Sequence, residues 1–170
     1  EPGDGGQRCV ALDVPVAVML GEQLRETPFG RLLLGDAVHG GDLQFNTITH
    51  IGKGWTDDLC IVRTFNGAEL ACSPSHRLIR NRVDRDGGAV RDLRVGEFIL
   101  TSINGCIERS RIKQIIHTRQ RAQVGMPTVT PGYTFAAGRK YATNWLDGLI
   151  MRLREVVGKR DVRMIISHNA

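Results

Sequence analysis

The sequence has few aromatic residues and no long apolar run. Its 170 residues include only 2 Trp, 2 Tyr and 5 Phe, too few to build a face on which nucleic-acid bases stack. The longest apolar run near the start, Val10 to Leu20, is interrupted by Asp13 and Pro15, and it is well short of the ~20 residues that cross a bilayer. No signal peptide is visible. We therefore expect no membrane partner, and a cytoplasmic location that follows the protein to which the segment belongs.

The cysteines are few and show no pairing pattern. Cys9, Cys60, Cys72 and Cys106 lie far apart, and no Cys-x-x-Cys pair occurs, so neither a zinc knuckle nor a disulfide framework is indicated. We predict no metal and no cofactor. Cys60, Cys72 and Cys106 are assigned to the hydrophobic core, because free cysteines are commonly buried.

The charge is balanced by sign, with 23 Lys and Arg against 18 Asp and Glu and a net charge of +5. Because 41% of the residues are hydrophobic, the chain can close the core of one folded domain, and disorder is excluded. The basic residues are spread along the whole chain, which disfavours a nucleic-acid partner.

The order of the chain predicts a mainly β module. Residues 1–8 are polar and Gly-rich and are expected to form a flexible leader, and the start at Glu1 rather than Met indicates a segment of a longer protein. Residues 9–143 hold short runs of Val, Ile, Leu and Thr, separated by turn residues at a spacing of roughly ten, which is typical of a sandwich or rolled sheet. Asn66-Gly67 predicts a hairpin turn. The expected strands are 14–20, 45–51, 59–65, 69–72, 77–80, 98–102, 112–118, 128–135 and 162–166.

Residues 144–160 differ from the rest, because their apolar residues recur at helical spacing. Asn144 is a suitable N-cap and Gly158 a suitable stop, so an amphipathic helix is expected there. Residues 161–170 then hold the terminal strand and the sequence His168-Asn169-Ala170.

A weak internal repeat points to duplication. Residues 33–38 (LLGDAV) recur as 93–98 (LRVGEF), each a leucine-bearing stretch that ends in Gly and an acidic residue and then enters an expected strand. Such a repeat predicts a pseudo-symmetric β architecture, although a match of this length also arises by chance.

Several short motifs follow one another along the chain. They are Cys9-Val10, the Gly-acid stretches at 33–38 and 93–97, Ser73-x-x-His76 within residues 67–78 (GAELACSPSHRL), an aromatic pair in 132–141 and the terminal His168-Asn169. Together they resemble the Hedgehog/intein (Hint) superfamily of self-processing modules. Cys9-Val10 matches the opening of the family's module, without the common Gly-Thr before the valine, and residues 67–78 match its strand leading into Thr-x-x-His, with Ser73 in the Thr place and His76 in the His place. The other motifs also have counterparts.

The resemblance implies a pseudo-two-fold rolled sheet and an autocatalytic activity at the start of the module. The thiol of Cys9 would attack the carbonyl carbon of Arg8 and form a thioester, because a thiol is a strong side-chain nucleophile. His76 would give a proton to the departing nitrogen, and Ser73 would hold the scissile amide. A small-molecule thiol would assist cleavage.

At the other end, the resemblance implies that His168 assists cyclisation of the Asn169 side chain, which breaks the bond to Ala170. The domain would therefore act once, on its own flanking segments. Splicing in the family requires Cys, Ser or Thr after the Asn, and Ala170 stands there. Either a nucleophile has been replaced, or the module only cleaves.

Two alternatives remain open at this point. In a rival alignment residues 147–153 take the place of the terminal strand, so that Arg152-Leu153 stands where His-Asn should be. The chain could also be a catalytically degenerate Hint module that serves as a structural or interaction part of a viral or secreted assembly, which the added helix favours. His39, His50 and His117 lie in no motif and are interpreted as core or surface residues, with His117 as a further candidate acid or base.

Overall fold

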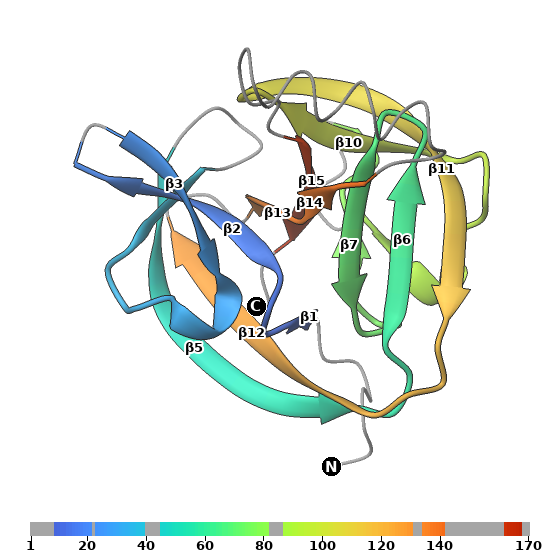
Figure 1. The fold of residues 1–170 in the computed structure, drawn as a ribbon, viewed down its shortest axis with the longest axis horizontal. Coiled ribbons are helices and arrows are strands. Elements are labelled where there is room, and N and C mark those ends of the chain that lie inside the picture. Colours follow the sequence, from blue (N-terminus) through green and yellow to red (C-terminus); the bar gives the residue numbers. More distant parts are fainter. Residues whose placement is uncertain are drawn as a thin grey trace.

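The computed structural model describes residues 9–21, 23–39, 45–81, 87–130, 134–141 and 162–167. Within these ranges the chain is mainly β, and the pairs between its strands are antiparallel (Figure 1), which confirms the predicted fold class. The leader at 1–8, the helix predicted at 144–160 and the terminal residues 168–170 lie outside the described residues. No helical turn in the described ranges has the length and apolar character of a membrane span.

The regular elements are strands of very different lengths and two single-turn 3-10 helices. The strands are β1 (Val10–Ala11), β2 (Pro15–Leu20), β3 (Gln23–Pro28), β4 (Ala37–His39), β5 (Phe45–Thr56), β6 (Cys60–Thr64), β7 (Ala68–Cys72), β8 (Arg77–Leu78), β9 (Gly88–Ala89), β10 (Phe98–Ile103), β11 (Cys106–His117), β12 (Ala122–Thr130), β13 (Thr134–Ala137), β14 (Arg139–Lys140) and β15 (Val162–Ser167). The 3-10 helices are η1 (Phe29–Arg31) and η2 (Val90–Asp92).

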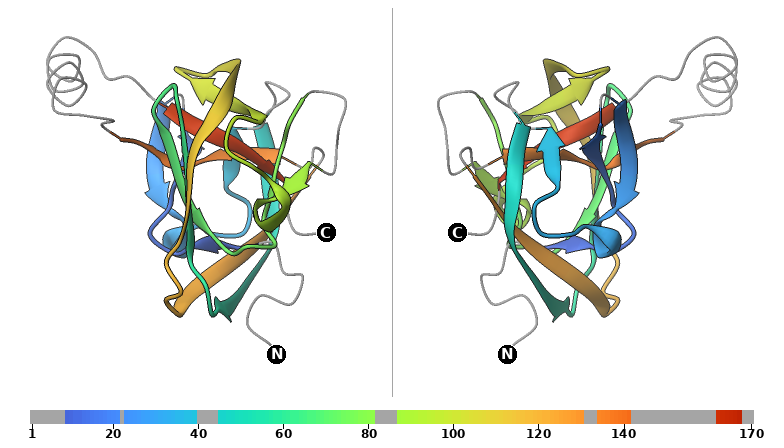
Figure 2. Two further views of the ribbon diagram at one scale, coloured as in Figure 1. Left: turned by 90° about the vertical axis from the view of Figure 1, so that its right-hand side faces the viewer. Right: turned by 90° about the vertical axis from the view of Figure 1, so that its left-hand side faces the viewer.

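The sheet rolls up and closes on itself. Its strand order runs β10-β11-β6-β7-β1-β12-β5-β4-β2-β13-β15-β8-β9. β15 also pairs with β10, so the path from β10 to β15 is closed. The long curved strands β5 and β12 form one side of the roll and β10 and β11 the other (Figures 1 and 2). Because side chains alternate across a strand, β6 and β7 each show a strict alternation of buried and half-buried residues. The inward set forms one main hydrophobic core.

The repeat seen in the sequence is also a repeat of structure. The backbone N–H of Leu33 donates to the side chain of Asp36 at 2.8 Å, and that of Arg94 donates to Glu97 at 2.8 Å. In both copies the glycine has a positive φ, 90° and 95°, and a 3-10 helix, η1 or η2, precedes the motif. The next bonds also correspond, with Gly35 N–H to Ile48 O at 2.9 Å and Gly96 N–H to Ile112 O at 2.8 Å. The two stretches therefore form equivalent loops, bond for bond, with Leu33 equivalent to Arg94 and not to Leu93.

The predicted hairpin and most predicted strands are confirmed. Gly67 has a φ of 96° in the turn between β6 and β7, and its N–H donates to the carbonyl of Thr64 at 3.2 Å, so that the glycine closes a three-residue hairpin loop. The terminal strand expected at 162–166 is β15. The strand expected at 128–135 is instead two strands, β12 and β13. Five of the described strands lie outside the expected ranges, namely β1, β3, β4, β9 and β14.

The assignment of Cys106 to the core is wrong. Cys106 is exposed, whereas Cys9, Cys60 and Cys72 are buried. The reason is the tight turn between β10 and β11, in which Asn104 and Gly105 both have positive φ. Cys106 is the first residue after this turn and pairs with Ile103 at the end of the ladder, so its side chain meets solvent.

Candidate functional site

Cys9 lies at the entrance of the short strand β1, between two strands from distant parts of the chain. Val10, the next residue, pairs with Cys72 of β7 on one side and with Gly125 of β12 on the other. Cys9 is completely buried, and so is Cys72. The roll therefore holds the residue after the Arg8–Cys9 bond in its interior.

A pair of reciprocal hydrogen bonds joins Cys9 to Ser73, the residue directly after β7. The backbone N–H of Cys9 donates to Ser73 Oγ at 3.2 Å, and the backbone N–H of Ser73 donates to the carbonyl of Cys9 at 2.9 Å. The hydroxyls of Ser73 and Ser75 are 3.3 Å apart. The structure thus brings together two of the residues that the sequence assigned to the site, although they are 64 positions apart.

His76 lies in a turn that is hydrogen-bonded to η2. Its backbone N–H donates to the carbonyl of Ser73 at 3.1 Å, and its carbonyl accepts from the N–H of Val90 in η2 at 2.9 Å. The N–H of Arg91 donates to the carbonyl of Pro74 at 2.9 Å. The His76 side chain is completely buried, so this imidazole is held within the protein on the same turn as Ser73.

The terminal strand β15 passes beside the segment that leaves His76. Ile166 pairs with Leu78 of β8, and the N–H of Ile79 donates to the carbonyl of Ile165 at 3.2 Å. The strand that leads to the His168-Asn169 pair is therefore next to the strand that starts after His76. Arg8, His168, Asn169 and Ala170 themselves lie outside the described residues, and so do residues 147–153 of the rival alignment.

Cys72 lies between the other buried thiols and is kept protonated. Burial raises the pKa of Cys72 well above its ordinary value, and the neighbouring thiols of Cys60 and Cys9 add to the rise. A thiol reacts as its thiolate. Cys72 is therefore a poor nucleophile, in agreement with its assignment to the core.

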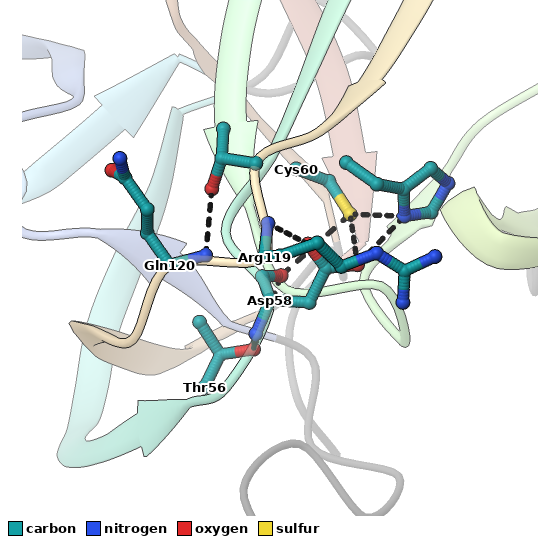
Figure 3. Close-up of polar contacts among 7 residues, drawn as sticks. Thr56, Asp58, Cys60, Arg119 and Gln120 are labelled. Atoms are coloured by element: carbon teal, nitrogen blue, oxygen red, sulfur yellow. Dashed lines mark hydrogen bonds and ion pairs between the residues drawn. The ribbon is translucent and has the colours of Figure 1, made fainter.

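A second group of reactive side chains was not foreseen. Residues Asp58, Cys60 and His117 meet where β6 begins and β11 ends (Figure 3). Asp58 Oδ2 is 2.7 Å from His117 Nδ1, and Cys60 Sγ is 3.3 Å from the same nitrogen. Cys60 and His117 are 57 positions apart in the sequence, so no sequence motif contains both. The group becomes visible only through the pairing of these two residues in the β6/β11 ladder.

The electrostatics of this second group favour an ionised Asp58. Burial by itself raises the pKa of Asp58, but the hydrogen bonds from His117 and from the backbone N–H of Arg119 outweigh it, so that the pKa lies below its ordinary value. The Arg119 bond is 2.8 Å long and reaches the other carboxylate oxygen, Oδ1. The carboxylate is thereby fixed with Oδ2 toward His117.

No protein-family model and no curated protein sequence matches the chain. Solved structures of inteins do match. A DnaB intein from Synechocystis sp. PCC 6803 superposes with a TM-score of 0.67 at 12% identity, covering 95% of this chain and 99% of that one. The TvoVMA intein gives 0.68 at 16% identity over 79% and 95% of the two chains, and the gp41-1 intein gives 0.61 at 15% identity over 76% and 92%.

The chain therefore has the Hint fold, the fold of the inteins. This confirms the fold that the motifs around Cys9 and His76 predicted. At these identities the likeness establishes the architecture, and the chemistry must be argued from the residues of this chain.

Proposed function

We propose that the chain is a self-processing domain that cleaves its own backbone at the Arg8–Cys9 and Asn169–Ala170 bonds. The observation that carries the proposal is the reciprocal hydrogen-bonded pair of Cys9 and Ser73, with His76 on the same turn, inside a Hint fold. A buried backbone N–H needs an acceptor in any protein; the support for processing is that the acceptor here is a side-chain hydroxyl, Ser73 Oγ, on the turn that carries His76.

The first step is an exchange of an amide for a thioester. Cys9 Sγ attacks the carbonyl carbon of Arg8 and forms a tetrahedral intermediate, and the thiol proton is released as the C–S bond forms. The C–N bond then breaks, the nitrogen of Cys9 takes up a proton, and an Arg8 thioester with a free α-amine on Cys9 remains. Attacking and leaving atoms belong to the same residue, so the step gains from enforced proximity.

Ser73 and His76 have separate roles in this step. The Cys9 N–H that donates to Ser73 Oγ belongs to the peptide group that must break, so Ser73 is a positioning residue that fixes its orientation. His76 is the proton donor to the departing nitrogen, a task for which imidazole is suited near neutral pH. Burial of both side chains keeps bulk water from competing for that proton.

At the other end, the side-chain amide nitrogen of Asn169 attacks its own carbonyl carbon. A succinimide forms, the bond to Ala170 breaks, and the leaving nitrogen takes a proton with the help of His168. The support from the structure is the course of β15, which pairs with β8 and so directs the chain toward the turn that carries His76.

Cleavage rather than splicing is the outcome proposed for this sequence. Splicing requires the residue after Asn169 to accept the upstream segment through a side-chain oxygen or sulfur, and the methyl group of Ala170 cannot do so. The partners of the domain are its own flanking segments. A small-molecule thiol would release the upstream segment from the thioester. The domain would share the location of the longer protein to which it belongs, which we propose is cytoplasmic.

The test is a fusion with a reporter protein upstream of Glu1, incubated with dithiothreitol. We expect release of the reporter as a thioester-derived fragment, no release from Cys9→Ala, and unchanged release from Cys106→Ser, the matched change at an exposed cysteine. His76→Gln should slow release by about 10²-fold or more, as loss of a general acid does. A wild-type fusion that stays intact over days would contradict the proposal and favour the structural module.

A further inference from the structure

The group formed by Asp58, Cys60 and His117 has no role in the proposed cleavage. We propose that it is a site for a thiophilic divalent transition-metal ion of the Zn²⁺ class. The ligand atoms are Asp58 Oδ2, Cys60 Sγ and His117 Nδ1, which lie within 4.8 Å of one another. The inference is independent of the proposed self-processing, because none of the residues proposed for that chemistry is a ligand.

The pattern of contacts favours a metal over a nucleophilic triad. In a relay of Cys, His and Asp, the thiol contacts one ring nitrogen and the carboxylate the other. Here both Cys60 Sγ, at 3.3 Å, and Asp58 Oδ2, at 2.7 Å, contact the same nitrogen, Nδ1 of His117. This arrangement suits one ion bound between the three atoms. Because the carboxylate and the thiol contact the same nitrogen, Asp58 cannot orient the His117 ring for proton transfer from Cys60.

The spacing of the three atoms is close to one face of a coordination tetrahedron. Bond lengths of ~2.0 to 2.3 Å place the ligand atoms of tetrahedral Zn²⁺ about 3.4 to 3.6 Å apart. The separation of Cys60 Sγ from Asp58 Oδ2 is 3.8 Å, and the other two distances are shorter. A small opening of the Asp58–His117 contact is therefore enough to admit an ion.

The backbone holds the three ligands in place. Cys60 and His117 are register partners in the β6/β11 ladder, and the pairing continues beyond it, with the N–H of Leu59 donating to Gln120 O at 3.0 Å. The N–H of Arg119 donates to Asp58 Oδ1, which orients the carboxylate as an outer-shell hydrogen bond does at metal centres. An ion that binds here would therefore need to order the three side chains only slightly, which lowers the entropy cost of binding.

The chemistry of the donors selects the ion. One thiolate, one imidazole and one carboxylate suit Zn²⁺ and Co²⁺, whereas Mg²⁺ and Ca²⁺ prefer oxygen ligands alone. On binding, the thiol proton of Cys60 goes to solvent, Nδ1 of His117 gives up any proton to bind as neutral imidazole, and nothing is oxidised or reduced. The His117 side chain is 38% exposed, so the fourth position is open to water.

The test is a titration of the reduced full chain with Co²⁺, followed by displacement with Zn²⁺. We expect one equivalent to give thiolate-to-cobalt charge-transfer absorption and the intense visible bands of tetrahedral cobalt. Cys60→Ser should abolish the charge-transfer band. Asp58→Asn and His117→Gln should each weaken binding about tenfold or more, while Cys9→Ala and Cys106→Ser should leave the affinity unchanged.

Two results would overturn the proposal. One is the absence of a charge-transfer band in the wild-type chain, and the other is a band that Cys9→Ala removes and Cys60→Ser retains, which would place the metal at the nucleophile. Cys60 is buried, so its variant must first be shown to fold by circular dichroism. If it does not fold, His117→Gln decides alone, because its partly exposed side chain can be replaced without opening the core, and unchanged binding would then refute the site.

Discussion

The amide nitrogen of Cys9 and the hydroxyl of Ser73 form a buried hydrogen bond 3.2 Å long. A second bond runs in the opposite direction, from the Ser73 N–H to the Cys9 carbonyl. The peptide group in front of the cysteine is thereby tied to the turn that carries His76. The position of this peptide group, and not only the identity of the residues, is the basis for proposing Cys9 as a nucleophile.

Replacement of Ser73 by Ala should affect both rate and stability. The Cys9 N–H would lose its acceptor in the interior, and an unsatisfied buried donor costs about 1 to 3 kcal/mol of unfolding free energy. We expect the rate of reporter release to fall at least about tenfold, while Ser73→Thr, which retains a hydroxyl, restores most of it. Urea unfolding and a time course of release check the two effects. Equal rates in Ser73→Ala and the wild type would show that this bond does not position the amide.

Gly125 should not tolerate a side chain. A Cβ atom at Gly125 would overlap the ring of Phe29, which is buried at 1% exposure, so either this buried ring or the β12 backbone must shift. Gly125→Ala is expected to lower the free energy of unfolding by about 1 to 3 kcal/mol, measured by urea denaturation. Phe29→Leu in the same chain should recover part of the loss, and the absence of any recovery would contradict this account.

Thiol reagents should distinguish Cys106 from the other cysteines. In the native chain Cys106 is exposed, and Cys9, Cys60 and Cys72 are buried. We expect one thiol to react rapidly with a disulfide reagent at neutral pH and the others to react only as the chain opens. Cys106→Ser should remove the rapid phase. Persistence of that phase in the variant would mean that another cysteine is accessible.

The raised pKa of Cys72 predicts a loss of stability at alkaline pH. In the unfolded chain this thiol ionises near its ordinary pKa of 9.0, whereas in the folded chain it stays protonated to higher pH. The folded state therefore binds more protons above about pH 9, and the free energy of unfolding falls as the pH rises toward the folded pKa. Cys72→Ala should show a shallower fall. Identical slopes for both proteins between neutral and alkaline pH would contradict the shift.

The sequence was sufficient for the parts of the fold that local chemistry determines. Asn66-Gly67 predicted a turn because its backbone conformation favours those residues, and the repeated Gly-acid motif predicted two equivalent turns because each acidic side chain caps its own loop. It failed for β3, whose residues Gln23–Pro28 are mostly polar. Among the described residues, β3 pairs only with β2. Backbone hydrogen bonds to β2 hold it in the sheet, so it forms a strand without an alternating apolar pattern in its own sequence.

The candidate site was predictable in the same partial way. The turn with Ser73 and His76 carries its own signature, so both residues could be proposed as site candidates without knowledge of the fold, and these two assignments remain predictions. The approach of Asp58 to His117 depends on the register of β6 against β11, including a register shift between Ile112 and Gln114, which no local pattern specifies. Long-range register is therefore the information that sequence reasoning lacked.

The place of β15 in the sheet has a consequence for the order of events during synthesis. The strand Val162–Ser167 pairs with β8, β10 and β13, all of which leave the ribosome earlier. Until residue 167 has emerged, the sheet lacks the strand that joins β8, β10 and β13. The described sheet can thus close only after residues 162–167 have been translated, and the proposed cleavage at the Arg8–Cys9 bond would have to wait for them.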